Sequence, residues 1–189
     1  MPKHIVLNVG MHRSGTSMVN RLLNLHGMHI PLETNYSDEY NPSGYWESFE
    51  LQHINDQILK MGDSSWSDPR AFDIKRFHKI DHTKLDSMTQ QFLDRLMEVE
   101  EEIILIKDPR MCRLIPIWLK LIEPTGAKVS AVFPIRNPLE VASSIRNRDQ
   151  FAIETGLQLW LRNVVEAEYA TRSIHNMPFD PGCRLPERA

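Results

Sequence analysis

A short turn bracketed by glycines, between an apolar strand and a helix, constrains this sequence most. Residues 4–10 are mostly apolar, as in a buried parallel strand, and Gly10 and Gly15 bracket the turn that follows. From Thr16 onward, apolar residues recur at helical spacing. Such a turn directs several backbone N–H groups and a helix N-terminus at one point. The sequence therefore predicts a site for phosphate or another tetrahedral oxyanion.

The same turn departs from the phosphate-binding loop of nucleoside triphosphatases. The spacing Gly10-x-x-x-x-Gly15 matches the first part of that loop, which then needs Lys directly after the second glycine. Here Thr16 stands in that place, and the basic residue within the turn is Arg13. A P-loop kinase or nucleotidase is one alternative, with Asp108 as its candidate metal-binding carboxylate. An ordinary strand–turn–helix corner is another.

Strand and helix patterns alternate along the rest of the chain. This alternation predicts an α/β fold with a parallel sheet flanked by helices. The 189 residues suffice for one domain, which we place at 1–173, with 174–189 as an irregular tail. Residues 62–80 are predicted to be a long connection that is either a binding loop or lid, or poorly ordered. The strands are predicted at 4–10, 103–107 and 128–135, and the helices at 16–26, 51–61, 83–100, 113–122, 138–148 and 152–173.

Charged or glycine-rich turns follow all three predicted strands. They cover residues 10–16, 107–110 and 136–138. Ligands of parallel sheets bind beyond the carboxyl ends of the strands. We therefore expect the three turns to converge on one site.

The first turn resembles a loop of a known enzyme family. The segment His12-Arg-Ser-Gly-Thr-Ser17 is similar to the 5′-phosphosulfate-binding loop of sulfotransferases that use PAPS, adenosine 3′-phosphate 5′-phosphosulfate. The resemblance implies that Arg13 contacts the 5′-phosphate and its bridging oxygen, and that Thr16 and Ser17 hydrogen-bond the 5′-phosphate. The cofactor-binding residues it implies in this loop are Gly10, His12, Arg13, Ser14, Gly15, Thr16 and Ser17.

A second motif lies after the third predicted strand. Arg136 ends that strand, and Ser144 lies two turns into the helix that Pro138 begins, so the two side chains can meet at one phosphate. The motif resembles the 3′-phosphate-binding segment of the same sulfotransferases, which have a Ser eight residues after the Arg. A surface arginine before a helix is the alternative interpretation.

The catalytic residues are taken from two further stretches. Lys107 matches a lysine of cytosolic sulfotransferases, but Pro109 stands where those enzymes have a catalytic histidine. The stretch Gly44-Tyr-Trp-Glu47 resembles one in a bacterial and carbohydrate-acting branch of the family, where the glutamate takes the acceptor's proton. Glu47 is therefore the predicted base. Its burial must raise its pKa for this role.

Two other interpretations of these residues stay open. His12 is an alternative base, although the neighbouring Arg13 disfavours its charged form. Glu47 is also compatible with a purely structural role, as an acidic residue that the dipole favours at the start of a helix.

The resemblance covers residues 4–172 and implies a three-layer α/β/α sulfotransferase fold. It implies that a sulfuryl group moves from PAPS to a hydroxyl or amine acceptor, a small molecule or a carbohydrate, without a metal. Glu47 would act as base, and Lys107 and Arg13 would stabilise charge on the bridging oxygen. Family members continue with another strand and a basic loop that 174–189 lack. We therefore expect a shortened member that either self-associates through an exposed sheet edge or is marginally stable, with Trp160, Leu161 and Val165 or their neighbours exposed on the last helix. A remnant that binds nucleotide or a partner without catalysis is the alternative.

Composition narrows the function classes further. The net charge of −3 argues against nucleic-acid binding by charge alone. No apolar run approaches the roughly 20 residues of a membrane helix. Cys112 and Cys183 suggest neither a disulfide framework nor a metal cluster. With no signal peptide apparent at the N-terminus, we expect a cytoplasmic protein without a membrane partner.

Overall fold

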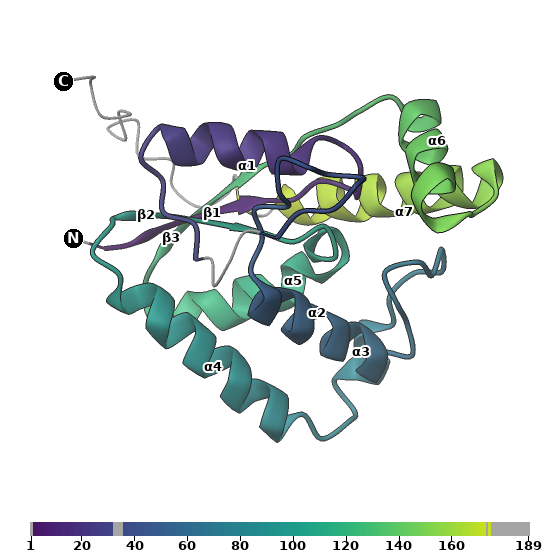
Figure 1. The fold of residues 1–189 in the computed structure, drawn as a ribbon. Coiled ribbons are helices and arrows are strands. Elements are labelled where there is room, and N and C mark those ends of the chain that lie inside the picture. The colour runs from purple at the N-terminus through teal and green to yellow at the C-terminus, as the bar shows by residue number, and fades with distance from the viewer. Residues whose placement is uncertain (1, 32–35, 173, 175–189) are drawn as a thin grey trace.

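The computed structural model describes residues 2–31, 36–172 and 174, which form an α/β fold around a small parallel sheet (Figure 1). The strand order is β2-β1-β3, with β1 in the centre and parallel to both neighbours. Within these residues the elements are β1 (His4–Asn8), α1 (Thr16–Leu25), α2 (Phe49–Met61), α3 (Ile74–Phe77), α4 (Thr83–Glu98), β2 (Ile103–Lys107), α5 (Met111–Ile122), a 3-10 turn (Glu123–Thr125), β3 (Lys128–Val132), α6 (Pro138–Asp149) and α7 (Ile153–Thr171).

The parallel sheet and the order of its elements confirm the predicted α/β class. Several boundaries differ from the predictions by one to three residues, and two of these differences have a visible cause. Strand β3 ends at Val132, shortly before Pro134, whose missing N–H cannot extend the strand ladder. Helix α5 begins at Met111, two residues earlier than predicted, because the chain already turns where the N–H of Met111 donates to the carbonyl of Asp108. Pro116 therefore lies inside the helix rather than in its first turn.

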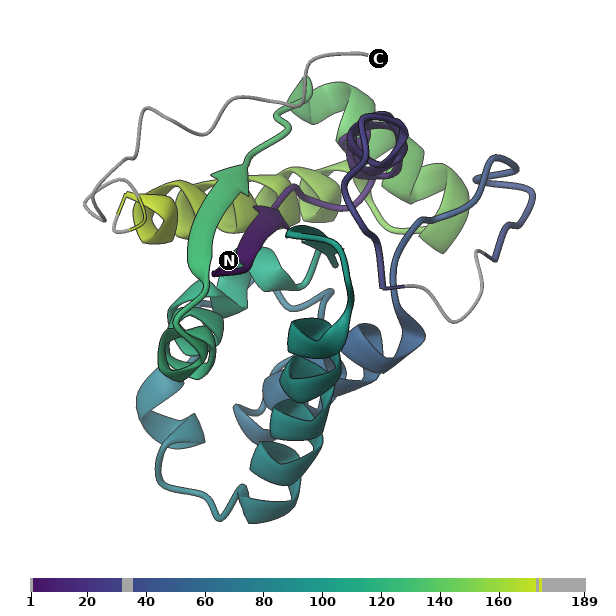
Figure 2. The same cartoon turned by 90° about the vertical axis from the view of Figure 1, so that its left-hand side faces the viewer.

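The alternation of side chains along β1 builds two layers of core. Ile5 and Leu7 point to one face and pack in a cluster with α2, α4, α5 and α7. Val6 points to the other face and packs with Met28 and Ile30, just beyond α1. Figure 1 shows α1 on one side of the sheet and α2, α4 and α5 on the other, and Figure 2 shows the same arrangement from the side. The carboxyl ends of the strands are thus left as the edge where loops gather.

A buried arginine on α5 orders the first part of the long connection at 62–80. The guanidinium of Arg113 donates to the carbonyls of Ser65 (3.0 Å), Asp68 (3.1 Å) and Arg70 (2.5 Å). It also forms an ion pair with Glu166 on α7 at 3.2 Å. The connection is therefore hydrogen-bonded to the core, and its second part contains the short helix α3.

The predictions for the C-terminal part have a mixed outcome. Leu161 and Val165 on α7 are exposed as expected, at 57% and 51%. Trp160 is only partly exposed, contrary to expectation, because it packs against the cluster of Met11, Val141, Ile145 and Leu159; its Nε1 donates to the carbonyl of Arg136. Ile174 is buried against the core, and the rest of the predicted tail lies outside the described residues. Among the helices of the described chain, none is both long and apolar enough to cross a bilayer.

Replacing Arg113 with methionine tests its role in the fold. We expect Arg113→Met to lower the free energy of unfolding by about 3 kcal/mol, because Glu166 and three loop carbonyls lose a buried partner. Urea unfolding followed by circular dichroism measures this loss. The exposed Arg172→Met is the matched control and should leave the unfolding midpoint unchanged. Equal midpoints for both variants would contradict the role of Arg113.

Candidate functional site

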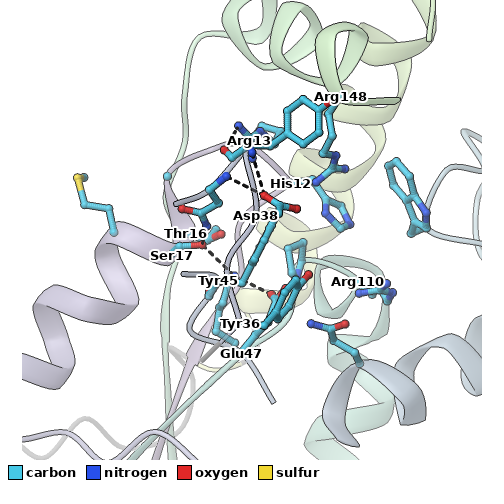
Figure 3. Close-up of a pocket in the computed structure, with 18 of the residues that line it drawn as sticks. His12, Arg13, Thr16, Ser17, Tyr36, Asp38, Tyr45, Glu47, Arg110 and Arg148 are labelled. Atoms are coloured by element: carbon cyan, nitrogen blue, oxygen red, sulfur yellow. Dashed lines mark hydrogen bonds and ion pairs between the residues drawn. The ribbon is translucent and has the colours of Figure 1, made fainter. Parts of the chain in front are cut away.

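The three turns at the carboxyl ends of the strands meet around one cavity, as the sequence predicted. The cavity has a volume of about 430 Å³. Its lining includes Arg13 from the first turn, Lys107 and Arg110 from the second and Arg136 from the third. Figure 3 shows side chains from these distant segments pointing toward a common space.

The first turn leaves the N-terminus of α1 open. Gly15 precedes α1 with a φ of +83°, a conformation that favours glycine, and no side chain caps the helix. Gly10 is required by close packing, since a Cβ there would lie 2.5 Å from Cγ2 of Thr16. The first N–H groups of a helix have no intrahelical acceptor. The geometry therefore suits an anion in front of α1.

Two buried asparagines tie this turn to the segment that carries Glu47. Nδ2 of Asn8 donates to the carbonyl of Thr16 and to Oδ1 of Asn20, each at 3.0 Å. Nδ2 of Asn20 in turn donates to the carbonyl of Trp46 at 2.7 Å. Sequence reasoning missed this network, although an asparagine within an apolar strand was a signal for it. It holds Glu47 beside the first turn.

Lys107 and Glu47, predicted separately as catalytic residues, form a buried ion pair. Nζ of Lys107 lies 2.7 Å from Oε2 of Glu47, and the two side chains are 2% and 7% exposed. The same ammonium donates to the carbonyl of Tyr45 at 2.9 Å and to Oγ of Ser17 at 3.3 Å. Lys107 therefore connects the first turn of α1 with the candidate base.

The environment of Glu47 has the property that the base prediction requires. Burial raises the pKa of Glu47 above its ordinary value, while the neighbouring ammonium of Lys107 acts in the opposite direction. The carboxylate is thus held close to a cation but out of water. Such a group is a stronger base than a solvated carboxylate.

The two predicted phosphate motifs lie side by side. Nε of Arg13 donates to Oγ of Ser144 at 2.8 Å, and an Nη1 of Arg136 donates to the carbonyl of Arg13 at 3.2 Å. Arg136 also pairs with Glu140 at 2.8 Å. Within the described chain, Arg13 has no carboxylate in ion-pair contact; its other hydrogen bond goes to the carbonyl of Tyr40. Its charge is therefore available to an anion.

His12 is enclosed next to Trp66, with ring centroids 4.8 Å apart. Its Nε2 is buried and has no hydrogen-bond partner among the described residues. Burial lowers the pKa of His12 well below its ordinary value, and the cations of Arg110 and Arg148 add to this effect. The imidazole is thus neutral, and the sequence argument identified only the smallest of these influences, Arg13.

Asp108, the candidate metal-binding carboxylate of the kinase alternative, is engaged elsewhere. It is fully buried, accepts the N–H of Arg110 at 2.7 Å and pairs with that guanidinium at 3.1 Å. Arg110 also pairs with Asp56 at 2.6 Å. Over residues 2–31, 36–172 and 174, no cluster of side chains suited to a metal ion is found.

Known proteins add no assignment to this geometry. No protein-family model matches the chain, and a search of curated proteins finds no match either.

The buried pair predicts a pH-dependent effect of removing its cation. Lys107→Met removes the group that lowers the pKa of Glu47, so that pKa rises further. As pH increases above the ordinary pKa of glutamate, the folded variant must bury an uncompensated charge, and its stability falls relative to the wild type. We expect a loss of about 3 kcal/mol near pH 8 and a smaller one near pH 5.

Urea unfolding at the two pH values measures this difference. The double variant Lys107→Met/Glu47→Gln should regain most of the stability at the higher pH, because the buried charge is gone. A loss that is independent of pH, and that the second substitution does not reverse, would show that the two groups are not coupled.

Proposed function

We propose that this protein transfers a sulfuryl group from PAPS to a hydroxyl or amine acceptor. The observation that carries the proposal is the position of Lys107, whose ammonium contacts both Ser17 at the start of α1 and the buried Glu47. A cation so placed adjoins an anion-binding helix N-terminus and a candidate base at once. The matching motifs of PAPS-dependent sulfotransferases support the same function, with a three-layer α/β/α fold of that type.

The donor is assigned to the side of the cavity formed by the phosphate loop. The 5′-phosphosulfate would lie at the N-terminus of α1, with Thr16 and Ser17 as hydrogen-bond donors. The 3′-phosphate would lie where Arg13, Arg136 and Ser144 gather. Arginine suits this role because its planar guanidinium presents several donors to phosphate oxygens.

The proposed reaction uses the residues according to their surroundings. Glu47 accepts the proton of the acceptor, and the acceptor oxygen or nitrogen attacks sulfur in line with the departing phosphate. Lys107 and Arg13 stabilise the negative charge that grows on the bridging oxygen. The side chain of Lys107 contacts Glu47 before the reaction and would face the leaving phosphate during it, so it compensates both charges in turn.

Binding of the product nucleotide tests the donor site. We expect adenosine 3′,5′-bisphosphate to raise the melting temperature without added metal, and Arg136→Ala to weaken its binding roughly 10- to 100-fold, the value of a charge-assisted phosphate contact. Calorimetric titration measures this affinity. Arg146→Ala, at an exposed arginine on the helix α6 that follows Arg136, is the matched control. Equal binding of 5′-AMP would overturn the 3′-site, and tighter binding of ATP with Mg²⁺ would favour the kinase alternative.

Removal of the proposed base separates chemistry from binding. We expect Glu47→Gln to bind adenosine 3′,5′-bisphosphate like the wild type but to transfer the sulfuryl group at least about 100-fold more slowly. The rate is measured as nucleotide released from PAPS with a panel of hydroxyl acceptors. An unchanged rate would return the role of base to His12 or to another residue. Nucleotide binding without any transfer in the wild type would identify a non-catalytic remnant.

A further inference from the structure

The side of the cavity that faces Thr16 and Ser17 carries hydrogen-bonding groups without partners in the described chain. Figure 3 shows His12 and Arg110 across the cavity from Thr16 and Ser17. We call this side, formed by His12, Tyr36, Gln52, Trp66 and Arg110, the distal wall.

Three neutral polar groups of the distal wall lack hydrogen bonds within the described chain. Nε2 of His12 and Nε2 of Gln52 are buried and unpartnered. The hydroxyl of Tyr36 makes no hydrogen bond either, although its ring is held between Tyr45 (4.5 Å) and Phe49 (5.0 Å). The two buried atoms, on His12 and Gln52, are unsatisfied at a cost in free energy, whereas the hydroxyl of the partly exposed Tyr36 is open to solvent. All three residues line the cavity, where a ligand would supply the missing partners.

The cations of the distal wall are already neutralised. Arg110 pairs with both Asp56 and Asp108. At the margin of the wall, Arg148 pairs with Asp149 at 2.8 Å. The wall therefore differs from the phosphate side, where Arg13 has no paired carboxylate. An anionic ligand would gain no free cation here, while losing its hydration.

The chemistry of the unpartnered groups favours hydroxyls. An amide offers both a donor and an acceptor, and a tyrosine hydroxyl does the same, as does a neutral imidazole with its two ring nitrogens. The terminal torsion of glutamine is broad and roughly two-fold, so Gln52 can present either its oxygen or its nitrogen to the cavity. A hydroxyl group also donates and accepts, whereas a carboxylate only accepts.

We propose that the distal wall binds an uncharged acceptor with several hydroxyl groups, such as a sugar ring or a polyol, and that Gln52 and Tyr36 determine this specificity. The inference rests on the proposed function in one respect only, namely that the bound molecule is the acceptor of the sulfuryl group. The hydrogen-bonding groups and the balance of charge stand independently of the donor. Glu47 adjoins the wall directly, since it precedes the helix that carries Gln52. A hydroxyl bound there would lie next to the candidate base.

The test compares two ligands that differ by one charge. Calorimetric titrations use the p-nitrophenyl β-D-glycosides of glucose, galactose and mannose, and the β-D-glucuronide, with and without adenosine 3′,5′-bisphosphate. We expect at least one neutral glycoside to bind, and the glucuronide to bind at least about fivefold more weakly than the glucoside. A glucuronide that binds as tightly as the glucoside, or the failure of all three neutral glycosides, would overturn the proposal.

Two variants connect this binding with the wall. Gln52→Leu and the conservative Tyr36→Phe should each lower the affinity for the neutral glycoside about three- to tenfold, which corresponds to the loss of one neutral hydrogen bond. Gln91→Leu, the same change on the exposed face of α4, is the control and should bind like the wild type. Unchanged affinity in both wall variants would overturn the assignment of the residues.

The nucleotide titrations keep the two proposals apart. Both wall variants should bind adenosine 3′,5′-bisphosphate like the wild type, because neither residue lies on the phosphate side. If the glycoside binds through Gln52 while the nucleotide does not bind at all, the proposed glycoside site at the distal wall stands and the assignment of PAPS as donor is wrong. If the nucleotide binds and no glycoside does, the donor site stands and the distal wall falls.

Discussion

The candidate site depends on one buried ammonium group. Lys107 ends the edge strand β2, and its Nζ is bonded to Glu47, to the carbonyl of Tyr45 and to Ser17. An enclosed cation is stable only when such partners replace its water. In return, the ammonium of Lys107 compensates a buried carboxylate beside the open N-terminus of α1. Three segments far apart in the sequence are thereby held around one point.

The sequence predicted those features that local chemistry determines. Apolar runs located the three strands, and the alternation with helices indicated that they are parallel, so the convergence of their turns followed from topology. The spacing of Gly10 and Gly15 predicted a tight turn. In the structure Gly10 is closely packed and Gly15 has a positive φ. Arg13, Lys107 and Arg136 were selected as candidates because they match residues of sulfotransferase motifs, and all three line the cavity.

The features that the sequence did not reveal depend on long-range partners. No periodicity in the sequence indicates that Arg113 binds the carbonyls of a loop more than 40 residues away. The sequence therefore did not decide whether residues 62–80 are an ordered binding loop or lid, or poorly ordered. Trp160 was expected to be exposed because no covering strand was predicted after the last helix. Its ring instead packs on side chains from other segments, and its Nε1 donates to the carbonyl of Arg136, which spacing does not reveal. The distal wall was missed for the same reason: Tyr36 and Gln52 belong to different segments, and only the fold shows that both lack partners.

The hydrogen bonds of Arg13 and Ser17 have a further consequence for the segment between α1 and α2. Arg13 donates to the carbonyl of Tyr40, and Ser17 accepts from Nδ2 of Asn41, so the residues suited to hold an anion also hold this segment. An anion that takes over these groups competes with the segment for them. By thermodynamic reciprocity, whatever detaches the segment must raise the affinity for the anion by the same factor. Anion binding at the first turn and attachment of Tyr40 and Asn41 to that turn would therefore be two sides of a single equilibrium.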